Sequence, residues 1–294
     1  MKNYLILFTL CLMGNFIHGQ QDSTGLPGDN FSLEGALSLF NTAKSPEEFE
    51  QLLNSESSHV NNLDLNQDGE IDYIKVMGRM DKDVHIFILQ VPISAAENQD
   101  IAVIELEKVG DNEAHIQIVG DEEIFGEEMI VEPGDGSQEE EMEEHKGGGP
   151  SPSGLSAFVV VNVWGWPCVR YIYTPGYVEF NSAWRWKIYP SWWAHRRPYA
   201  YSVWRPYRYN HRVATVRVVH THRLVAAHRM YTPGRAHSTT VRTHYAGAHK
   251  NYTVTKKKTT VTGPHGRSHT KTTKTVKGPH GHTKSQSTKV RRGK

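Results

Sequence analysis

The chain has 294 residues, of which 37% are hydrophobic, and its net charge of +1 conceals two blocks of opposite sign. Residues 20–150 contain 31 Asp and Glu against 6 Lys and Arg, and residues 151–294 contain 26 Lys and Arg against one acid, Glu179, so the blocks carry −25 and +25. Because apolar residues are sparse in the last third, the composition excludes two large packed domains and favours one compact domain.

The first residues have the pattern of a secretory signal peptide at 1–19. Lys2 supplies a positive end, an apolar run extends from Tyr4 to Met13, and cleavage is expected near Gln20. Export to the periplasm, the cell surface or the extracellular space is therefore predicted. The apolar run is too short for a comfortable span, so no transmembrane span is expected in the mature chain.

The acidic domain at 20–133 is predicted to begin with two helices. An apolar face with helical spacing begins at Leu33 and ends at Phe40, and either Asn30 or Ser32 is available as the cap of this helix. A second helix is predicted from Pro46, because Ser45 can cap it and Glu48 can complete a capping box.

The remainder of this acidic domain has the pattern of β-strands. Apolar and β-branched runs, separated by turn residues, occur at 73–80, 84–91, 101–109 and 114–119. In the third run, the alternation predicts that Glu105 and Glu107 face water. We therefore expect an α+β fold in which the two N-terminal helices cover one face of an antiparallel β-meander.

The most specific motif is the loop Asp64-Leu65-Asn66-Gln67-Asp68-Gly69-Glu70-Ile71-Asp72. Oxygen-bearing side chains stand at positions 1, 3, 5 and 9 and a glycine at position 6, the spacing by which a short loop surrounds a hard cation. Ca²⁺ is the predicted cofactor. Its ligands would be the side chains of Asp64, Asn66, Asp68 and Asp72 and the backbone carbonyl of Glu70. The role would be structural; the alternative is an acidic turn that binds nothing.

This loop resembles the calcium loops of EF-hands and dockerins, and more closely the DxDxDGxxD loops of integrin-type extracellular β-structures. The acid that EF-hands carry at position 12 is here Lys75, whereas the integrin-type loop ends at its ninth residue and continues into a strand. The wider stretch 61–133 is similar to a group of exported proteins of Gram-negative bacteria with no assigned activity. That second resemblance implies an extracytoplasmic location.

A linker rich in acids, Gly, Pro and Ser is predicted at 134–154, and an aromatic, Arg- and His-rich region follows at 155–250. Residues 155–163 are a strand candidate, and all seven tryptophans lie between Trp164 and Trp204. Arginine stacks on aromatic faces and grips anions with two N–H groups, which suits nucleic acid, acidic glycans or the acidic half of this chain. The alternative is that the aromatic residues pack as an irregular wrap around the sheet.

Histidines in this region raise the question of a metal. Edge strands are allowed between 212 and 249, and on one of them His220 and His222 would point to the same side. No carboxylate or thiolate in this stretch fixes a geometry, and dense arginine repels a cation, so a basic, pH-responsive surface is the favoured interpretation. Cleavage of the signal peptide would leave Cys168 as the single cysteine, interpreted as a small apolar filler.

Residues 251–294 form a low-complexity tail of Thr, Lys, His and Gly in which Gly-Pro-His-Gly occurs twice, 15 residues apart. Such a composition cannot bury enough apolar surface to fold alone. The tail is therefore predicted to be disordered and to bind polyanions through its charge.

No Gly-x-Ser-x-Gly, His-Glu-x-x-His or phosphate-loop motif occurs in the sequence, so an enzyme is not predicted. The sequence favours an exported, non-enzymatic envelope or extracellular protein whose C-terminal half associates with anionic envelope polymers and contacts its own acidic half. The alternative is a nucleic-acid-binding protein outside the cytoplasm, for which base stacking predicts a preference for single strands.

Overall fold

The computed structural model describes residues 23–134, 160–210, 216–219 and 222–250, and it describes the strands 253–262, 268–277 and 283–292 by their backbone alone. The predicted signal peptide lies outside these residues, as does the predicted linker apart from Gly134. Among the described residues, no helix combines the length and the apolar character needed to cross a membrane.

Two capped helices open the fold. The first helix, α1 (Leu33–Thr42), begins after Ser32, whose side chain accepts the N–H of Gly35. The second helix, α2 (Pro46–Asn54), begins after Ser45, whose hydroxyl accepts the N–H of Glu48. Short 3-10 turns, η1 (Pro27–Asn30) and η2 (Glu56–Ser58), flank the pair. Both helices start where the capping pattern predicts, because serine satisfies N–H groups that a first turn leaves without partners.

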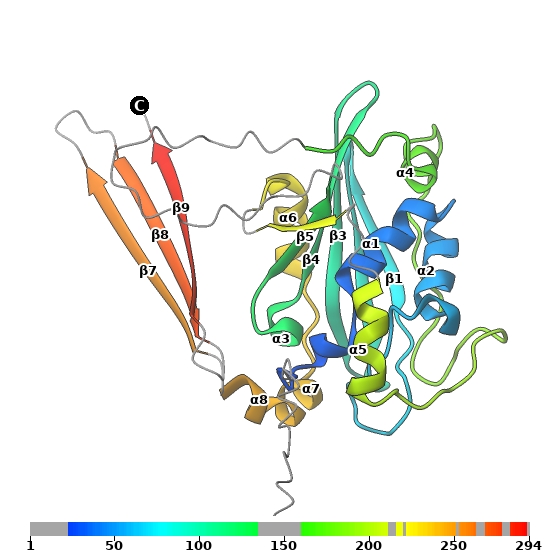
Figure 1. Cartoon of the computed structure of the whole chain (residues 1–294). Coiled ribbons are helices and arrows are strands. Elements are labelled where there is room, and N and C mark those ends of the chain that lie inside the picture. The colour runs from blue at the N-terminus through cyan, green and yellow to red at the C-terminus, as the bar shows by residue number, and fades with distance from the viewer. Residues whose placement is uncertain are drawn as a thin grey trace, which may run out of the picture.

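A six-stranded antiparallel sheet follows these helices (Figure 1), in the order β1-β2-β3-β4-β5-β6. Its strands are β1 (Lys75–Asp81), β2 (Val84–Pro92), β3 (Asn98–Gly110), β4 (Glu113–Gly120), β5 (Met129–Pro133) and β6 (Val216–Val219), with α3 (Glu122–Phe125) between β4 and β5. The α+β class, with N-terminal helices preceding an antiparallel sheet, is confirmed. The sixth strand comes from the basic half of the sequence and pairs with β5.

Both faces of the sheet are buried. One face and the helices α1 and α2 enclose the main core, which includes Phe40, Phe49 and Phe87. The opposite face carries a second cluster of Ile86, Val103 and other apolar residues, and α6 (Val225–Tyr231) packs on it, as Figure 1 shows. The expectation that Glu105 faces water is therefore wrong: its side chain is fully buried, because a helix that lies far along the chain covers this face.

The described part of 155–250 shares the core of the acidic half. Its helices are α4 (Pro167–Ile172), α5 (Tyr201–Asn210), α6, α7 (Thr239–His244) and α8 (Ala246–Lys250), with the 3-10 turn η3 (Thr232–Gly234) after α6. Residues from α4 and α7, including Val169 and Val241, belong to the main core cluster. Residues 160–163 are not a strand, and the rest of the strand expected at 155–163 lies outside the described residues. The packing thus makes one unit of the two charged halves.

The chain beyond α4 also covers the free edge of β1. The N–H of Gly78 donates to the carbonyl of Phe180 at 2.7 Å, and the N–H of Ser182 donates to the carbonyl of Val76 at 3.0 Å. A Cβ at position 78 would lie 2.7 Å from that Phe180 oxygen, so only glycine allows this approach. An otherwise exposed strand edge is thereby protected from pairing with another chain.

The tail contains three further strands, β7 (Thr253–Thr262), β8 (Ser268–Lys277) and β9 (Thr283–Arg292), which form an antiparallel sheet of their own. Only their backbone is described, and the residues between them are not. Disorder of 251–294 accordingly stays a prediction.

Trp204 tests whether the basic segment is part of the folded unit. Its side chain is 1% exposed, and its Nε1–H donates to the carbonyl oxygen of Asp29 at 3.0 Å. We expect Trp204→Ala to lower the free energy of unfolding by about 3 to 5 kcal/mol, because it leaves a cavity and removes a buried hydrogen bond. Urea denaturation measures the change. Trp192→Ala is the control, because Trp192 is 46% exposed; equal losses in the two variants would contradict the packing role.

Candidate functional site

The predicted calcium loop has its side-chain oxygens turned toward its own backbone. The carboxylate of Asp64 accepts the N–H groups of Asp68 and Gly69 at 3.1 and 3.0 Å. Asn66 accepts the N–H of Asp68 at 3.0 Å, and Asp68 accepts that of Glu70 at 2.9 Å. Gly69 has φ +85°, which supports the expectation that position 6 needs glycine.

Asp72 is the buried end of this loop. Its carboxylate accepts the N–H of Leu65 at 2.6 Å, and the side chain is largely shielded from water. Burial raises the pKa of Asp72 to about 8, and the carboxylates of Asp64 and Asp68 add to the effect. Burial and the neighbouring Asp68 also raise the pKa of Asp64. Carboxylates that repel one another in this way would be stabilised by a bound divalent cation.

The five predicted ligands do not converge on one point in this structure. Among the described residues, there are two groups of three His, Asp or Glu side chains whose ligand atoms lie within 4.8 Å of one another. The carboxylates of the loop belong to neither group. The side chain of Glu70 turns away, since its Oε2 lies 2.5 Å from Nδ1 of His195, which agrees with a role for its carbonyl alone. A calcium ion would require Asp64, Asp68 and Asp72 to move closer together.

The C-terminal segments hold this loop from outside. His195 contacts Glu70, and the carbonyl of Arg196 accepts the N–H of Ile71 at 2.7 Å. The hydroxyl of Tyr245, the residue directly after α7, donates to the carbonyl of Asp64 at 3.0 Å. The conformation of the loop therefore depends on residues that lie more than a hundred positions further along the chain.

Most aromatic side chains of the basic segment are packed rather than displayed. Trp193 and Trp204 are buried, Trp164 and Trp166 pack against the main core, and of the seven tryptophans only Trp192 is exposed. Around Tyr73, the rings of Tyr189 and Trp193 lie with centroids 5.7 and 5.4 Å away. This arrangement agrees with an irregular wrap around the sheet and leaves little aromatic surface for a ligand.

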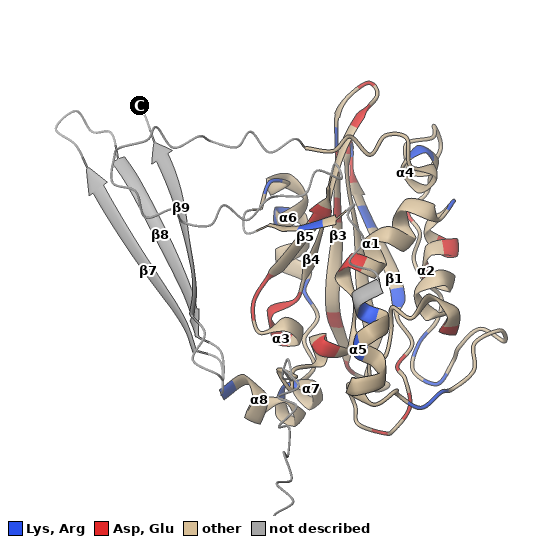
Figure 2. Cartoon of the chain, in the orientation of Figure 1, with Lys and Arg blue, Asp and Glu red and all other residues tan. Residues whose placement is uncertain are grey.

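Five arginines of this segment form ion pairs with the acidic half. Figure 2 shows acidic positions on the sheet and around α3, with basic positions on the segments that pack against them. The shortest of these ion pairs for which a side chain is fully buried joins Arg235 to Asp121 at 2.7 Å. Other pairs join Arg217 and Arg223 to Glu132, Arg242 to Glu123, and Arg208 to Asp29.

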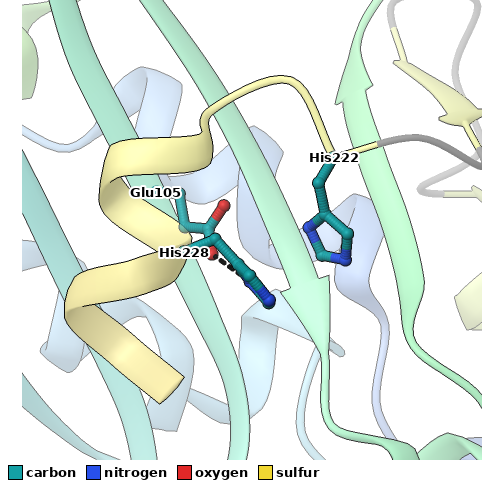
Figure 3. Close-up of side chains that lie close together, drawn as sticks. All are labelled: Glu105, His222 and His228. Atoms are coloured by element: carbon teal, nitrogen blue, oxygen red, sulfur yellow. Dashed lines mark hydrogen bonds and ion pairs between the residues drawn. The ribbon is translucent and has the colours of Figure 1, made fainter. Parts of the chain in front are cut away.

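The second face of the sheet contains a cluster that the sequence reasoning missed (Figure 3). Glu105 on β3 is fully buried beneath α6. Its carboxylate accepts the side-chain amide of Gln117, its partner on β4, and lies 3.1 Å from Nδ1 of His228 on α6. The pKa of His228 is raised, mainly by its hydrogen bond to Glu105. Burial opposes this effect, and the negative charges of Glu105 and Glu128 add to it.

His222 completes this cluster from the segment that leads into α6. Its ring centroid lies 4.0 Å from that of His228, and its Nε2 lies 3.3 Å from a carboxylate oxygen of Glu128. Its Nδ1 is buried without a hydrogen-bond partner. Glu105, His222 and His228 together form one of the two groups whose ligand atoms converge within 4.8 Å.

The local sequence around His222 could not reveal this arrangement. His220, its expected partner, lies outside the described residues, and the carboxylate that seemed to be lacking comes from β3, 117 positions earlier in the chain. One signal was present: Ile101, Ala102, Val103 and Ile104 are all apolar, which is typical of a strand buried on both faces. That signal predicts burial of Glu105 but not its partners.

Arg235 tests the ion pairs that join the halves. Asp121 has no exposed side-chain surface, so Arg235→Ala would leave a buried carboxylate without its cation. We expect the free energy of unfolding to fall by about 3 to 5 kcal/mol. Arg242→Ala is the matched control, because Arg242 is 63% exposed in its pair with Glu123, and it should cost less than about 1 kcal/mol. Urea denaturation that gave both variants the same loss would contradict this ranking.

Comparison with known proteins adds no family to these observations. No family model, no curated protein and no solved structure matches this chain. Its function is therefore inferred from its own side chains and their surroundings.

Proposed function

We propose that this protein is an exported, non-enzymatic envelope or extracellular protein that associates with anionic polymers through its basic tail. The observation that carries the proposal is where the cations lie. Five arginines of the folded basic segment, Arg208, Arg217, Arg223, Arg235 and Arg242, make ion pairs with the acidic half. The segment 256–294, by contrast, contains 12 Lys and Arg and no acid.

A charge density of this kind favours polyanions over small ligands. Each lysine or arginine that neutralises an anionic group releases a condensed counterion, so binding is strong at low salt and weakens steeply as salt rises. The folded unit would then serve as the carrier of the tail. Acidic glycans and other anionic envelope polymers are the ligand class that suits the predicted export.

The described residues support a binding role better than a catalytic one. Cys168 is buried in the main core, and burial raises the pKa of its thiol, which makes it a poor nucleophile. His85 is also buried, against the ring of Tyr173, and burial lowers its pKa to about 4. Both residues act as packing groups.

Calcium is proposed as a structural ion of the loop at 64–72. The raised pKa of Asp72 and the hydrogen bonds that hold Asp64 and Asn66 toward the loop interior support this role. The ion would neutralise Asp64, Asp68 and Asp72 and stabilise the chain just before β1. In an exported protein, calcium is a natural source of such stabilisation.

Nucleic-acid binding outside the cytoplasm is the second candidate, and one observation favours it. Trp192 is exposed at a hollow of about 430 Å³ that Arg196 also lines. Glu48 and Glu56 line the same hollow, however, and their charge repels phosphate. Anionic polymers held by charge alone are therefore the favoured ligands.

Removal of calcium should destabilise the folded unit. We expect a chelator to lower the melting temperature, because an ion that binds only the folded state adds about 2.7 kcal/mol at a hundredfold excess over its Kd. Asp68→Ala should abolish the difference between the calcium-loaded and chelated protein. Differential scanning calorimetry measures both effects.

Asp111→Ala is the control for this experiment, since Asp111 is an exposed acid in the hairpin turn between β3 and β4. It should keep the full response to calcium. Identical melting curves with chelator and with saturating calcium would contradict the proposal that calcium stabilises the folded unit.

Deletion of 251–294 should weaken binding to every polyanion and flatten its dependence on salt. Fluorescence anisotropy at several salt concentrations, with an acidic glycan, polyphosphate and single-stranded DNA as probes, measures both. Trp192→Ala in the full chain separates the two candidate functions. If nucleic acid is the ligand, the substitution should cost about 1 to 3 kcal/mol with DNA alone. Unchanged affinity after tail deletion would contradict the main proposal.

A further inference from the structure

Glu105 is buried at a place where its charge has little compensation. It lies on β3, in the middle of the sheet, with no exposed surface. Its neighbour across the strand pair is Gln117, an amide that donates a hydrogen bond but carries no charge. An ionised carboxylate in such surroundings is costly unless a cation lies beside it.

The two histidines of the cluster present nitrogen lone pairs to the same space. His228 directs Nδ1 at Glu105, and His222 directs Nε2 at Glu128. When Nε2 of His222 donates its proton to Glu128, Nδ1 of the same ring is a bare lone pair, and His228 presents the lone pair of Nδ1 beside Glu105 when its proton is on Nε2. Nδ1 of His222 is such an atom: it is buried, and no donor reaches it.

We propose that Glu105, His222 and His228 form a binding site for a divalent transition-metal ion of the zinc class. Imidazole nitrogen and carboxylate oxygen are the ligands that zinc accepts at about 2.0 to 2.2 Å, so neighbouring ligands of a tetrahedral site lie about 3.3 Å apart. The separation of 3.1 Å between Glu105 and His228 agrees with such an edge, and all three ligand atoms already lie within 4.8 Å. Small side-chain rotations would close the site.

Glu128 has a supporting role in this site. Ligating histidines usually donate their second ring N–H to a carboxylate, which orients the ring and selects the tautomer. Glu128, from the turn before β5, stands 3.3 Å from Nε2 of His222 and so leaves Nδ1 for the metal. The ligands would come from the sheet, from the segment before α6 and from α6 itself, so the ion would fasten the basic segment to the acidic sheet.

The second converging group, Asp121, Glu123 and His237, fits a cation less well. Arg235 already pairs with Asp121, and Arg242 already pairs with Glu123. The two guanidinium groups already neutralise these carboxylates, and their positive charge repels a metal ion. Glu105, by contrast, is hydrogen-bonded by the amide of Gln117 and by the imidazole of His228, and imidazole is itself a ligand that zinc accepts.

Cobalt(II) is the probe that tests this proposal, because a four-coordinate cobalt site absorbs visible light far more strongly than a six-coordinate one. The full chain is stripped with a chelator and titrated with cobalt in excess calcium, which occupies the loop at 64–72 if that loop binds. We expect an intense visible band that saturates at one equivalent and disappears when zinc is added. Weak absorption throughout the titration would overturn the proposal.

Single substitutions then locate the site. His222→Gln and His228→Gln should each weaken cobalt binding by at least about 10-fold, and Glu128→Gln, which disturbs the orientation of His222, by about 10- to 100-fold. His115→Gln is the matched control, since His115 also contacts a glutamate, Glu113, at 3.0 Å but belongs to neither of the converging groups found among the described residues. It should leave the band unchanged. Loss of the band in His115→Gln, or its survival in His222→Gln, would contradict the assignment.

The metal-free variants must be shown to fold. Near-ultraviolet circular dichroism reports the packing of the buried tryptophans, and it should be the same for the metal-free wild type and for His222→Gln. His222 lies outside α6 and is partly exposed, so its replacement perturbs the core least. If His228→Gln unfolds, the His222→Gln and His115→Gln pair decides the question alone.

Discussion

The fold depends on the cover that the basic segment provides for the second face of the sheet. A six-stranded sheet with Ile86, Ile88 and Val103 on that face would expose an apolar surface to water if α6 were absent. The hydrophobic effect, at about 25 cal/mol for each Å² of apolar area buried, supplies the driving force for this contact. The ion pairs from Arg217, Arg223 and Arg235 then set its register, because each reaches a particular carboxylate.

Buried polar groups join the same two parts of the chain on the helical side. Glu50 on α2 accepts hydrogen bonds from the hydroxyl of Tyr73 at 2.8 Å, the N–H of Val76 at 2.7 Å and the hydroxyl of Ser182 at 3.0 Å. Burial raises the pKa of this carboxyl, and the three hydrogen bonds oppose the effect. Because an unsatisfied buried acceptor is expensive, this network favours one arrangement of α2, β1 and the segment around Ser182.

These contacts change how the charge asymmetry of the sequence should be understood. Two blocks of −25 and +25 suggest two separate charged modules. In the structure, the folded part of the basic block is joined to the acidic one by five arginine ion pairs and by hydrogen bonds such as that from the N–H of Tyr199 to Asn62 at 2.7 Å. The tail carries 12 further Lys and Arg, and the candidate metal cluster lies where the two blocks meet.

The sequence by itself determined the local elements: the capped helices after Ser32 and Ser45, the first four strands, and the glycine turn of the loop at 64–72. Each depends on neighbours within a few positions, through capping, alternation and turn geometry. Only the tertiary structure decided that Glu105 is buried, that Trp204 is a core residue, and that His222 and His228 lie beside a carboxylate 117 and 123 positions earlier in the chain. The physical reason is that residues close in sequence do not specify which distant segments will pack on each face of a strand. Those distant segments decide which side chains of the strand are buried and which groups they contact.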